Sequence, residues 1–226
     1  TNMDEGALGA MGDNEYFGRC QNPLVNGFTP GGSSSGSAVA VASGMAMGAI
    51  GTDALGSIRI PASYCGIVGF KPSRNLINTL GLLPFSWTLD TVGTMTRSVG
   101  DSFLILSAIL GIPVDNDRLP NDITGTTIGV PWQLIEQSAD LTSEVRTAFD
   151  KAIATFKKLG AIIKPITLPN YDMKELRRSA WLVGCAEAAE FHLDSLRDTP
   201  DFFSNTFRQM MKYGQQASNQ EKIGAL

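Results

Sequence analysis

Two serines stand 24 positions apart, each in a loop of glycine and other small residues. Ser33 lies in the run Gly-Gly-Ser-Ser-Ser-Gly-Ser of residues 31–37, and Ser57 closes the run Gly-Thr-Asp-Ala-Leu-Gly-Ser of residues 51–57. A serine hydroxyl is a weak nucleophile at neutral pH, so it needs a base to take its proton and donors to hold the developing oxyanion. Loops of small residues bring backbone N–H groups close to a reacting carbonyl. The pattern therefore indicates nucleophilic chemistry at a substrate carbonyl.

The second loop carries candidate partners for this chemistry. Its turn offers a row of backbone N–H groups that can bind an oxyanion, those of Ala54, Leu55, Gly56 and Ser57. Because backbone donors do not depend on the side chain, Leu55 is compatible with this role. Asp53 and Arg59 flank Ser57 with opposite charges, and we expect them to pin the turn between them.

Three other interpretations of the first loop stay open but are less favoured. A flexible glycine–serine linker is disfavoured because a buried helix is predicted directly after it. A phosphate-binding loop would end in Gly-Lys-Ser or Gly-Lys-Thr, which is absent. Residues 32–36 also fit Gly-x-Ser-x-Gly, with Ser34 as the nucleophile. That arrangement needs a preceding strand, which residues 28–30 do not favour, and a histidine. The only histidine, His192, is expected to be structural.

The elements that must position the two loops are predicted from hydrophobic patterning. Residues 37–47 are small and apolar on all sides, which indicates a buried helix, with Met45 and Met47 filling the core. A short strand is expected over 49–52 and a buried strand over 65–70, the latter containing Cys65.

Loop is predicted over 81–93. Ser98 is predicted to cap a helix that runs to about Leu110, with Asp101 completing a capping box and Gly111 ending the helix.

The second half of the sequence predicts a strand–helix–strand unit after a polar linker at 115–125. Strands are expected at 127–130 and 161–168, joined by an amphipathic helix that ends before Gly160. This order favours parallel strand pairing. Two further helices are expected, over 172–198 and 201–213, and the fold class is α/β.

Composition excludes several classes of protein. The chain has 226 residues, 43% of them hydrophobic, and a net charge of −4 without a basic cluster, which argues against nucleic acid as a partner. Three cysteines without paired spacing predict neither a disulfide framework nor a metal site. No apolar run approaches the ~20 residues that span a bilayer. A cytoplasmic location is the resulting expectation.

The linked motifs resemble the amidase signature family of serine hydrolases. The family's second serine run, Gly-Thr-Asp-x-Gly-Gly-Ser-Ile-Arg-x-Pro, matches residues 51–61, and the similarity to the family's sequence continues at 62–72 and 89–93. The opening Thr-Asn-Met-Asp-Glu of residues 1–5 is also similar. The resemblance is dense over 1–110 and thinner from 127 to about 191.

This resemblance implies a mixed central β-sheet covered by helices on both faces. Residues 1–226 would form one segment of such a domain, incomplete at both ends. Its signature core would span 1–113, and a strand–helix–strand and helical part would span 126–226.

Carried over by position, the resemblance implies that Ser57 is the nucleophile that forms the acyl ester. Ser33 would be the relay serine, preceded by a cis peptide bond. The third catalytic member of the family, a neutral lysine, is expected before Thr1, since Lys71 lies in a run where the family has no base.

Three positions depart from the family pattern. Ser35 and Leu55 stand where many members have glycine, and Leu55 is expected to narrow the pocket. Gly6 stands where an aromatic residue is common, and its small size is expected to alter one wall of the substrate cleft.

The function implied is hydrolysis of a small-molecule carboxamide to an acid and ammonia or an amine, with no metal or organic cofactor. A glutaminase subunit of a tRNA-dependent amidotransferase, working with a partner subunit, is the alternative. A catalytically inactive truncated homologue is the third hypothesis, and a homodimer stays open for the hydrolase.

Overall fold

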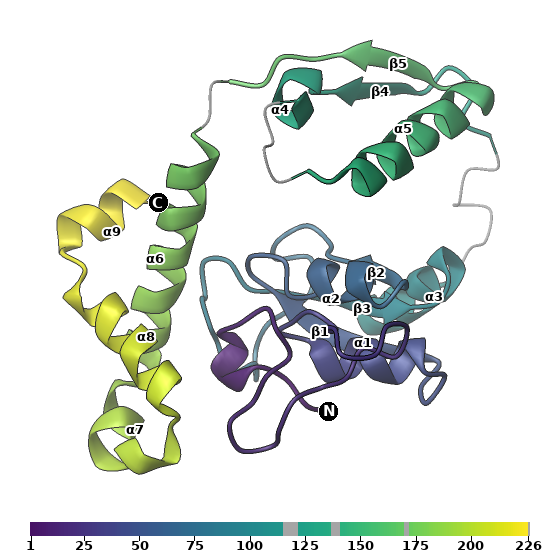
Figure 1. The fold of residues 1–226 in the computed structure, drawn as a ribbon. Helices are drawn as coiled ribbons and strands as arrows, with labels where there is room; N and C mark the ends of the chain where they lie inside the picture. The colour runs from purple at the N-terminus through teal and green to yellow at the C-terminus, as the bar shows by residue number, and fades with distance from the viewer. Residues whose placement is uncertain (115–121, 137–140, 170–171, 226) are drawn as a thin grey trace. The chain divides into compact units, whose positions relative to one another are not determined.

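The computed structural model describes residues 1–114, 122–136, 141–169 and 172–225 (Figure 1). The chain divides into two compact units, one of Thr1–Val114 with Lys174–Leu226 and one of Asp115–Met173. The C-terminal helices thus belong with the two serine loops. Both helices and strands are present, which confirms the α/β class.

The sheet of the first unit is antiparallel, with strand order β1-β3-β2. These strands are β1 (Gly48–Asp53), β3 (Thr91–Thr96) and β2 (Val68–Phe70). β1 pairs with β3 from Gly48 opposite Thr96 to Asp53 opposite Thr91. The prediction of loop up to residue 93 was wrong, because the central strand begins at Thr91. Its buried residues are mostly threonines, so its sequence lacks the apolar signal of a core strand.

α1 (Ser35–Ala42) is buried at its start and ends five residues earlier than predicted. The positive φ of 74° at Gly44 turns the chain away from the helix. Met45 and Met47 follow this turn and are 80% and 84% exposed, so the prediction that they fill the core was wrong. The Arg97 guanidinium donates to the carbonyls of Val41 and Ala46 at 3.0 and 2.9 Å and so satisfies the end of the helix.

α2 (Arg59–Tyr64) contacts both α1 and β2. A core cluster joins these elements through Ala38, Ile58, Ala62, Cys65 and Met95. Cys65 caps the end of α2 rather than lying in a strand, since β2 begins only at Val68. Burial raises the pKa of the Cys65 thiol to about 11, which keeps it protonated at neutral pH.

α3 (Val99–Leu110) has the predicted caps. The Asp101 N–H donates to Ser98 Oγ at 3.1 Å, and Ser98 Oγ donates to the Asp101 carboxylate at 2.7 Å. Gly111 ends the helix with a left-handed φ of 64°.

The second unit forms the predicted strand–helix–strand arrangement. β4 (Thr127–Val130) pairs in parallel with β5 (Ile162–Pro165), and α5 (Ser143–Lys158) lies between them in sequence. A short α4 (Trp132–Glu136) follows β4. Residues 115–121 of the predicted linker lie outside the described residues. Among described residues, antiparallel and parallel pairs occur in separate sheets, so one mixed sheet stays a prediction.

The C-terminal part of the first unit is helical. The helix expected over 172–198 is two, α6 (Met173–Phe191) and α7 (Leu193–Asp198), separated at His192. α8 (Asn205–Gln216) and α9 (Asn219–Ala225) follow. None of the described helices is both long enough and apolar enough to cross a membrane.

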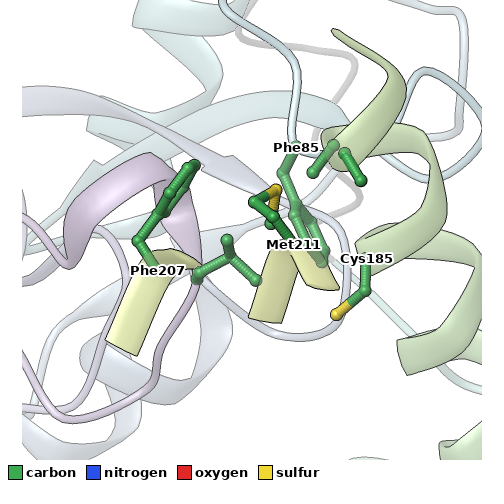
Figure 2. Close-up of a cluster of buried hydrophobic side chains, with 7 residues drawn as sticks. Phe85, Cys185, Phe207 and Met211 are labelled. Carbon is green, nitrogen blue, oxygen red and sulfur yellow. The ribbon is translucent and has the colours of Figure 1, made fainter. Parts of the chain in front are cut away.

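An apolar cluster holds α6 and α8 to the N-terminal segment, which includes the short 3-10 helix η1 (Glu5–Ala7). Figure 2 shows side chains of this cluster converging from the loop before β3, from α6 and from α8. Its buried members are Leu8, Phe85, Cys185, Ala188, Ala189, Phe207 and Met211. Ala54, from the turn that precedes Ser57, packs against the same cluster.

α8 packs directly against the backbone of α6 at Gly214. A Cβ atom at this position would overlap the carbonyl of Cys185. We expect Gly214→Ala to lower the free energy of unfolding by about 1–3 kcal/mol, because the rigid backbone of α6 must move. The matched control is Gly224→Ala in α9, where a Cβ atom would meet no heavy atom within 4 Å.

The control should be neutral or stabilising by up to about 1 kcal/mol, because alanine favours helix more than glycine does. Chemical denaturation of both variants measures the two effects. Equal effects of the two substitutions would contradict a close helix contact.

Candidate active site

Ser33 is fully buried directly before α1. The peptide bond between Gly32 and Ser33 is cis, as the resemblance implied. Ser33 Oγ is buried and forms no hydrogen bond within the described part of the chain. Buried hydroxyls are nearly always paired, so an unpaired one is a candidate for a functional role.

Ser57 is partly exposed in the turn between β1 and α2. The Ser34 N–H donates to the Ser57 carbonyl at 3.1 Å, so the residue beside Ser33 is tied directly to the residue predicted as the nucleophile. The structure therefore brings the two serine loops into contact through their backbones.

Ser34 itself has a structural position. Its Oγ accepts from the Thr52 N–H and donates to the Thr52 carbonyl, both at 3.2 Å. A Cβ atom at Gly51 would lie only 2.8 Å from Ser34 Oγ, so glycine is needed for this approach. Because the Ser34 hydroxyl is hydrogen-bonded to the backbone of Thr52 in β1, these contacts argue against Ser34 as a nucleophile.

His192 has an environment of aromatic rings. The rings of Phe191, Phe203 and Phe207 lie 4.9–5.9 Å from its own, centroid to centroid. Burial lowers its pKa, although the charge of Glu5 opposes this effect. This packing supports a structural role for His192.

The Asp53 carboxylate is fully buried at the end of β1 and holds the Ser57 turn. Arg59 binds it with two nitrogens, Nε to Oδ2 at 3.0 Å and Nη2 to Oδ1 at 2.9 Å. The backbone N–H groups of Gly56, Ile58 and Arg59 donate to the same carboxylate at 2.7, 3.1 and 3.3 Å. The predicted pinning of the turn by Asp53 and Arg59 thus has a geometric basis.

Two opposing effects act on the pKa of Asp53. Burial raises it, but the hydrogen bonds from Arg59, Ile58 and Gly56, together with the positive charge of Arg59, outweigh burial and hold the pKa below its ordinary value. The carboxylate is therefore ionised at neutral pH and can accept hydrogen bonds from all five of these N–H donors.

The N–H groups proposed for an oxyanion divide into two kinds. The Gly56 N–H donates to Asp53, which removes it from the expected set of four donors. Within the described residues, the N–H groups of Ala54, Leu55 and Ser57 have no acceptor. Gly56 also has φ of 128°, a conformation that favours glycine. Three backbone donors thus stay available in the turn.

The N-terminal segment encloses the first serine loop, a role that was not predicted. The buried Asp4 carboxylate accepts from the N–H groups of Gly12 and Asp13 at 3.0 and 3.3 Å. A Cβ atom at Gly32 would overlap this carboxylate. The Asn2 carbonyl accepts from the Gly36 N–H at 2.8 Å. The only signal in the sequence was the family-like run of residues 1–5.

The space that a side chain at position 6 would take is filled by the ring of Phe207. A Cβ atom at Gly6 would overlap the ring of Phe207, which comes from α8 and is 2% exposed. An aromatic ring thus stands beside the glycine after Asp-Glu, but it comes from 201 positions further along the chain. The effect of Gly6 on a wall of the substrate cleft stays a prediction.

Comparison with known proteins identifies the family. A profile of the family called Amidase matches residues 1–223. The chain belongs to the amidase signature family. Its sequence is 40% identical to a Glutamyl-tRNA(Gln) amidotransferase subunit of Geobacter sp. (strain M21), over 83% of this chain and 40% of that protein. The subunit of the same name from Halothermothrix orenii is 41% identical, over 76% of this chain and 38% of that protein.

Solved structures agree with this assignment. The crystal structure of an amidase aligns with a TM-score of 0.88 at 34% identity, covering 99% of this chain and 49% of that one. The native peptide amidase from Stenotrophomonas maltophilia aligns with a TM-score of 0.77 at 26% identity, covering 100% and 54%. The chain therefore spans about two fifths of these curated relatives and about half of these solved amidases.

The Asp53 clamp makes a prediction about stability and pH. We expect Asp53→Asn to lower the free energy of unfolding by about 3 kcal/mol, because an amide group turns a donor towards buried N–H donors. Arg59→Gln should cost less, about 1–2 kcal/mol, because three backbone N–H groups still bind the buried Asp53 carboxylate and the Arg59 side chain is 53% exposed.

The pH dependence follows from the lowered pKa. A depressed carboxylate pKa stabilises the folded state above the unfolded-state pKa, and this stabilisation is lost as pH falls through the folded-state value. The difference between wild type and Asp53→Asn should therefore be largest above about pH 4 and shrink below it. Denaturation at several pH values measures this, and a constant difference would contradict an ionised clamp.

Proposed function

We propose that this chain is part of an amidase that hydrolyses a carboxamide through an acyl ester on Ser57. One arrangement carries the proposal. The ionised Asp53 holds a turn in which Ser57 is partly exposed and three backbone N–H groups are unpaired within the described residues. Backbone donors fixed before the reaction are the usual means of stabilising a tetrahedral oxyanion.

The proposed reaction has two stages. Ser57 Oγ attacks the amide carbon, and the carbonyl oxygen becomes an oxyanion held by N–H groups of Ala54, Leu55 and Ser57. The serine proton passes through Ser33 to a base and then to the leaving nitrogen. As the C–N bond breaks, ammonia or an amine departs and Ser57 carries the acyl group. Water then cleaves the ester, releases the acid and restores the hydroxyl.

The base in this proposal is the lysine expected before Thr1. The relay role of Ser33 is supported by its buried, unpaired Oγ and by the bond between Ser34 and Ser57. The 226-residue chain alone is expected to be inactive or barely active, whereas the protein expressed from its complete gene should turn over small amides.

A second candidate is the glutaminase subunit of a tRNA-dependent amidotransferase. It is favoured by the relatives at 40% and 41% identity, both of which are named as subunits of Glutamyl-tRNA(Gln) amidotransferase. Hydrolysis of simple amides by the protein alone would favour the amidase. Strict dependence on glutamine, together with co-purification of a second subunit, would favour the amidotransferase.

The decisive experiment replaces the two serines in the protein expressed from its complete gene. Ser57→Ala should lower kcat by about 10⁴-fold or more and abolish labelling by a fluorophosphonate, because the nucleophile is lost. Ser33→Ala should lower kcat by about 10²–10⁴-fold, since proton transfer is impaired. The matched control is Ser63→Ala, an exposed serine on α2, which should behave as wild type.

Amide turnover and mass spectrometry of the labelled protein measure these effects. Labelling of a residue other than Ser57, or full activity of Ser57→Ala, would overturn the proposal.

A further inference from the structure

A carboxylate on α6 holds a loop that lies about a hundred positions earlier in the sequence. Glu187 Oε2 accepts from Ser86 Oγ at 2.5 Å and from the Thr88 N–H at 3.0 Å. Its other oxygen, Oε1, accepts from Thr88 Oγ1 at 2.5 Å. All three bonds end on one ionisable group, and hydrogen bonds to a charged acceptor are the stronger kind. Glu187 therefore fixes the loop at two positions, Ser86 and Thr88.

A second carboxylate closes the same loop from within. Asp90 Oδ2 accepts from the N–H groups of Phe85 and Ser86 at 2.9 and 3.0 Å. Ser86 thus bonds to both carboxylates, through its N–H to Asp90 and through its hydroxyl to Glu187. Burial raises the pKa of Asp90, and the nearby charge of Glu187 adds to this effect. Because Asp90 and Glu187 lie close together, the loop's N–H and hydroxyl donors that bond to them offset the repulsion between the two carboxyl groups.

This loop borders the Ser57 turn in two ways. Directly after Asp90, the chain enters β3 at Thr91, which lies opposite Asp53 in the β1–β3 register. At the other end of the loop, Phe85 belongs to the apolar cluster against which Ala54 packs. Figure 2 shows Phe85 among the cluster residues contributed by α6 and α8. The loop therefore supports both the residue that pins the turn and a residue of the turn itself.

We propose that Glu187 is a positioning residue for the turn that carries Ser57. This inference rests on the proposed function. Glu187 fixes Ser86 and Thr88, so that Phe85 and Thr91 keep the turn's three N–H groups aimed at the oxyanion. Loss of this support would misplace the donors slightly, and a displacement of about 1 Å can cost about 10²-fold in rate. The donors act mainly on the transition state, so the loss should appear in kcat rather than in KM.

The experiment compares three substitutions in the protein expressed from its complete gene. Glu187→Ala should lower kcat and the rate of fluorophosphonate labelling of Ser57 by about 10–100-fold, with KM changed less than about threefold. Glu187→Gln should recover most of this loss, because the amide oxygen still accepts from Ser86 and Thr88 and the amide group can donate to the Thr88 hydroxyl.

The control is Glu190→Ala, an exposed carboxylate one turn further along α6, which should match wild type. Thr88→Val removes one hydroxyl donor from the other side and should lower the labelling rate by about 3–10-fold. It also tests the inference if Glu187→Ala does not fold. Thermal melting checks that each variant is folded.

The outcomes separate this inference from the proposed function. If the wild type is labelled at Ser57 and folded Glu187→Ala and Thr88→Val react at its rate, the inference is overturned and the proposed function stands. If only the melting temperature falls while labelling is unchanged, Glu187 is merely structural and the inference is likewise overturned. If the wild type is not labelled at Ser57, both fall together.

Discussion

The buried Asp53 carboxylate is the constraint on which the rest of the site depends. It gathers two nitrogens of Arg59 and three backbone N–H groups within six residues, which forces the chain after β1 into one tight turn. A buried charge is tolerated only when it is paired and hydrogen-bonded. The same bonds that satisfy this charge therefore decide which N–H groups of the turn are already paired. The Gly56 N–H is paired with Asp53, whereas those of Ala54, Leu55 and Ser57 have no acceptor within the described residues.

Glycine is the second requirement, because neighbouring segments approach the backbone too closely at these positions to leave room for a Cβ atom. Gly32 lies against the Asp4 carboxylate, Gly36 against the backbone of Asn2, and Gly51 against Ser34. At each position a Cβ atom would come within 3 Å of its neighbour. The small residues noticed in the sequence are thus contact points between segments rather than flexible spacers. This explains why a run rich in glycine and serine is almost entirely buried.

The features that could be predicted from the sequence are those set by neighbouring residues. The Ser98 cap of α3, its end at Gly111, and the unit of β4, α5 and β5 all follow from local patterns. β3 was missed because its buried residues are mostly threonines, which give no apolar signal in the sequence. They are buried because β3 is the central strand, and the hydroxyls of Thr94 and Thr96 are satisfied by hydrogen bonds. The bonds of Glu187 to Ser86 and Thr88, like the Phe207 ring above Gly6, join segments far apart in sequence. No local pattern encodes such contacts, because their partners meet only after the chain has folded.

The proposed chemistry of the site explains how any carboxamide would react, but not which carboxamide is selected. In the proposed reaction, the two serines and the three backbone donors would contact only the carbonyl and its leaving nitrogen, features that every carboxamide shares. Because glutamine carries the same amide group as other primary carboxamides, the turn by itself favours neither of the two proposed functions. We expect selection between the two proposed functions to come from side chains around the turn. Leu55 is the turn's own candidate for such a side chain, because it is 40% exposed.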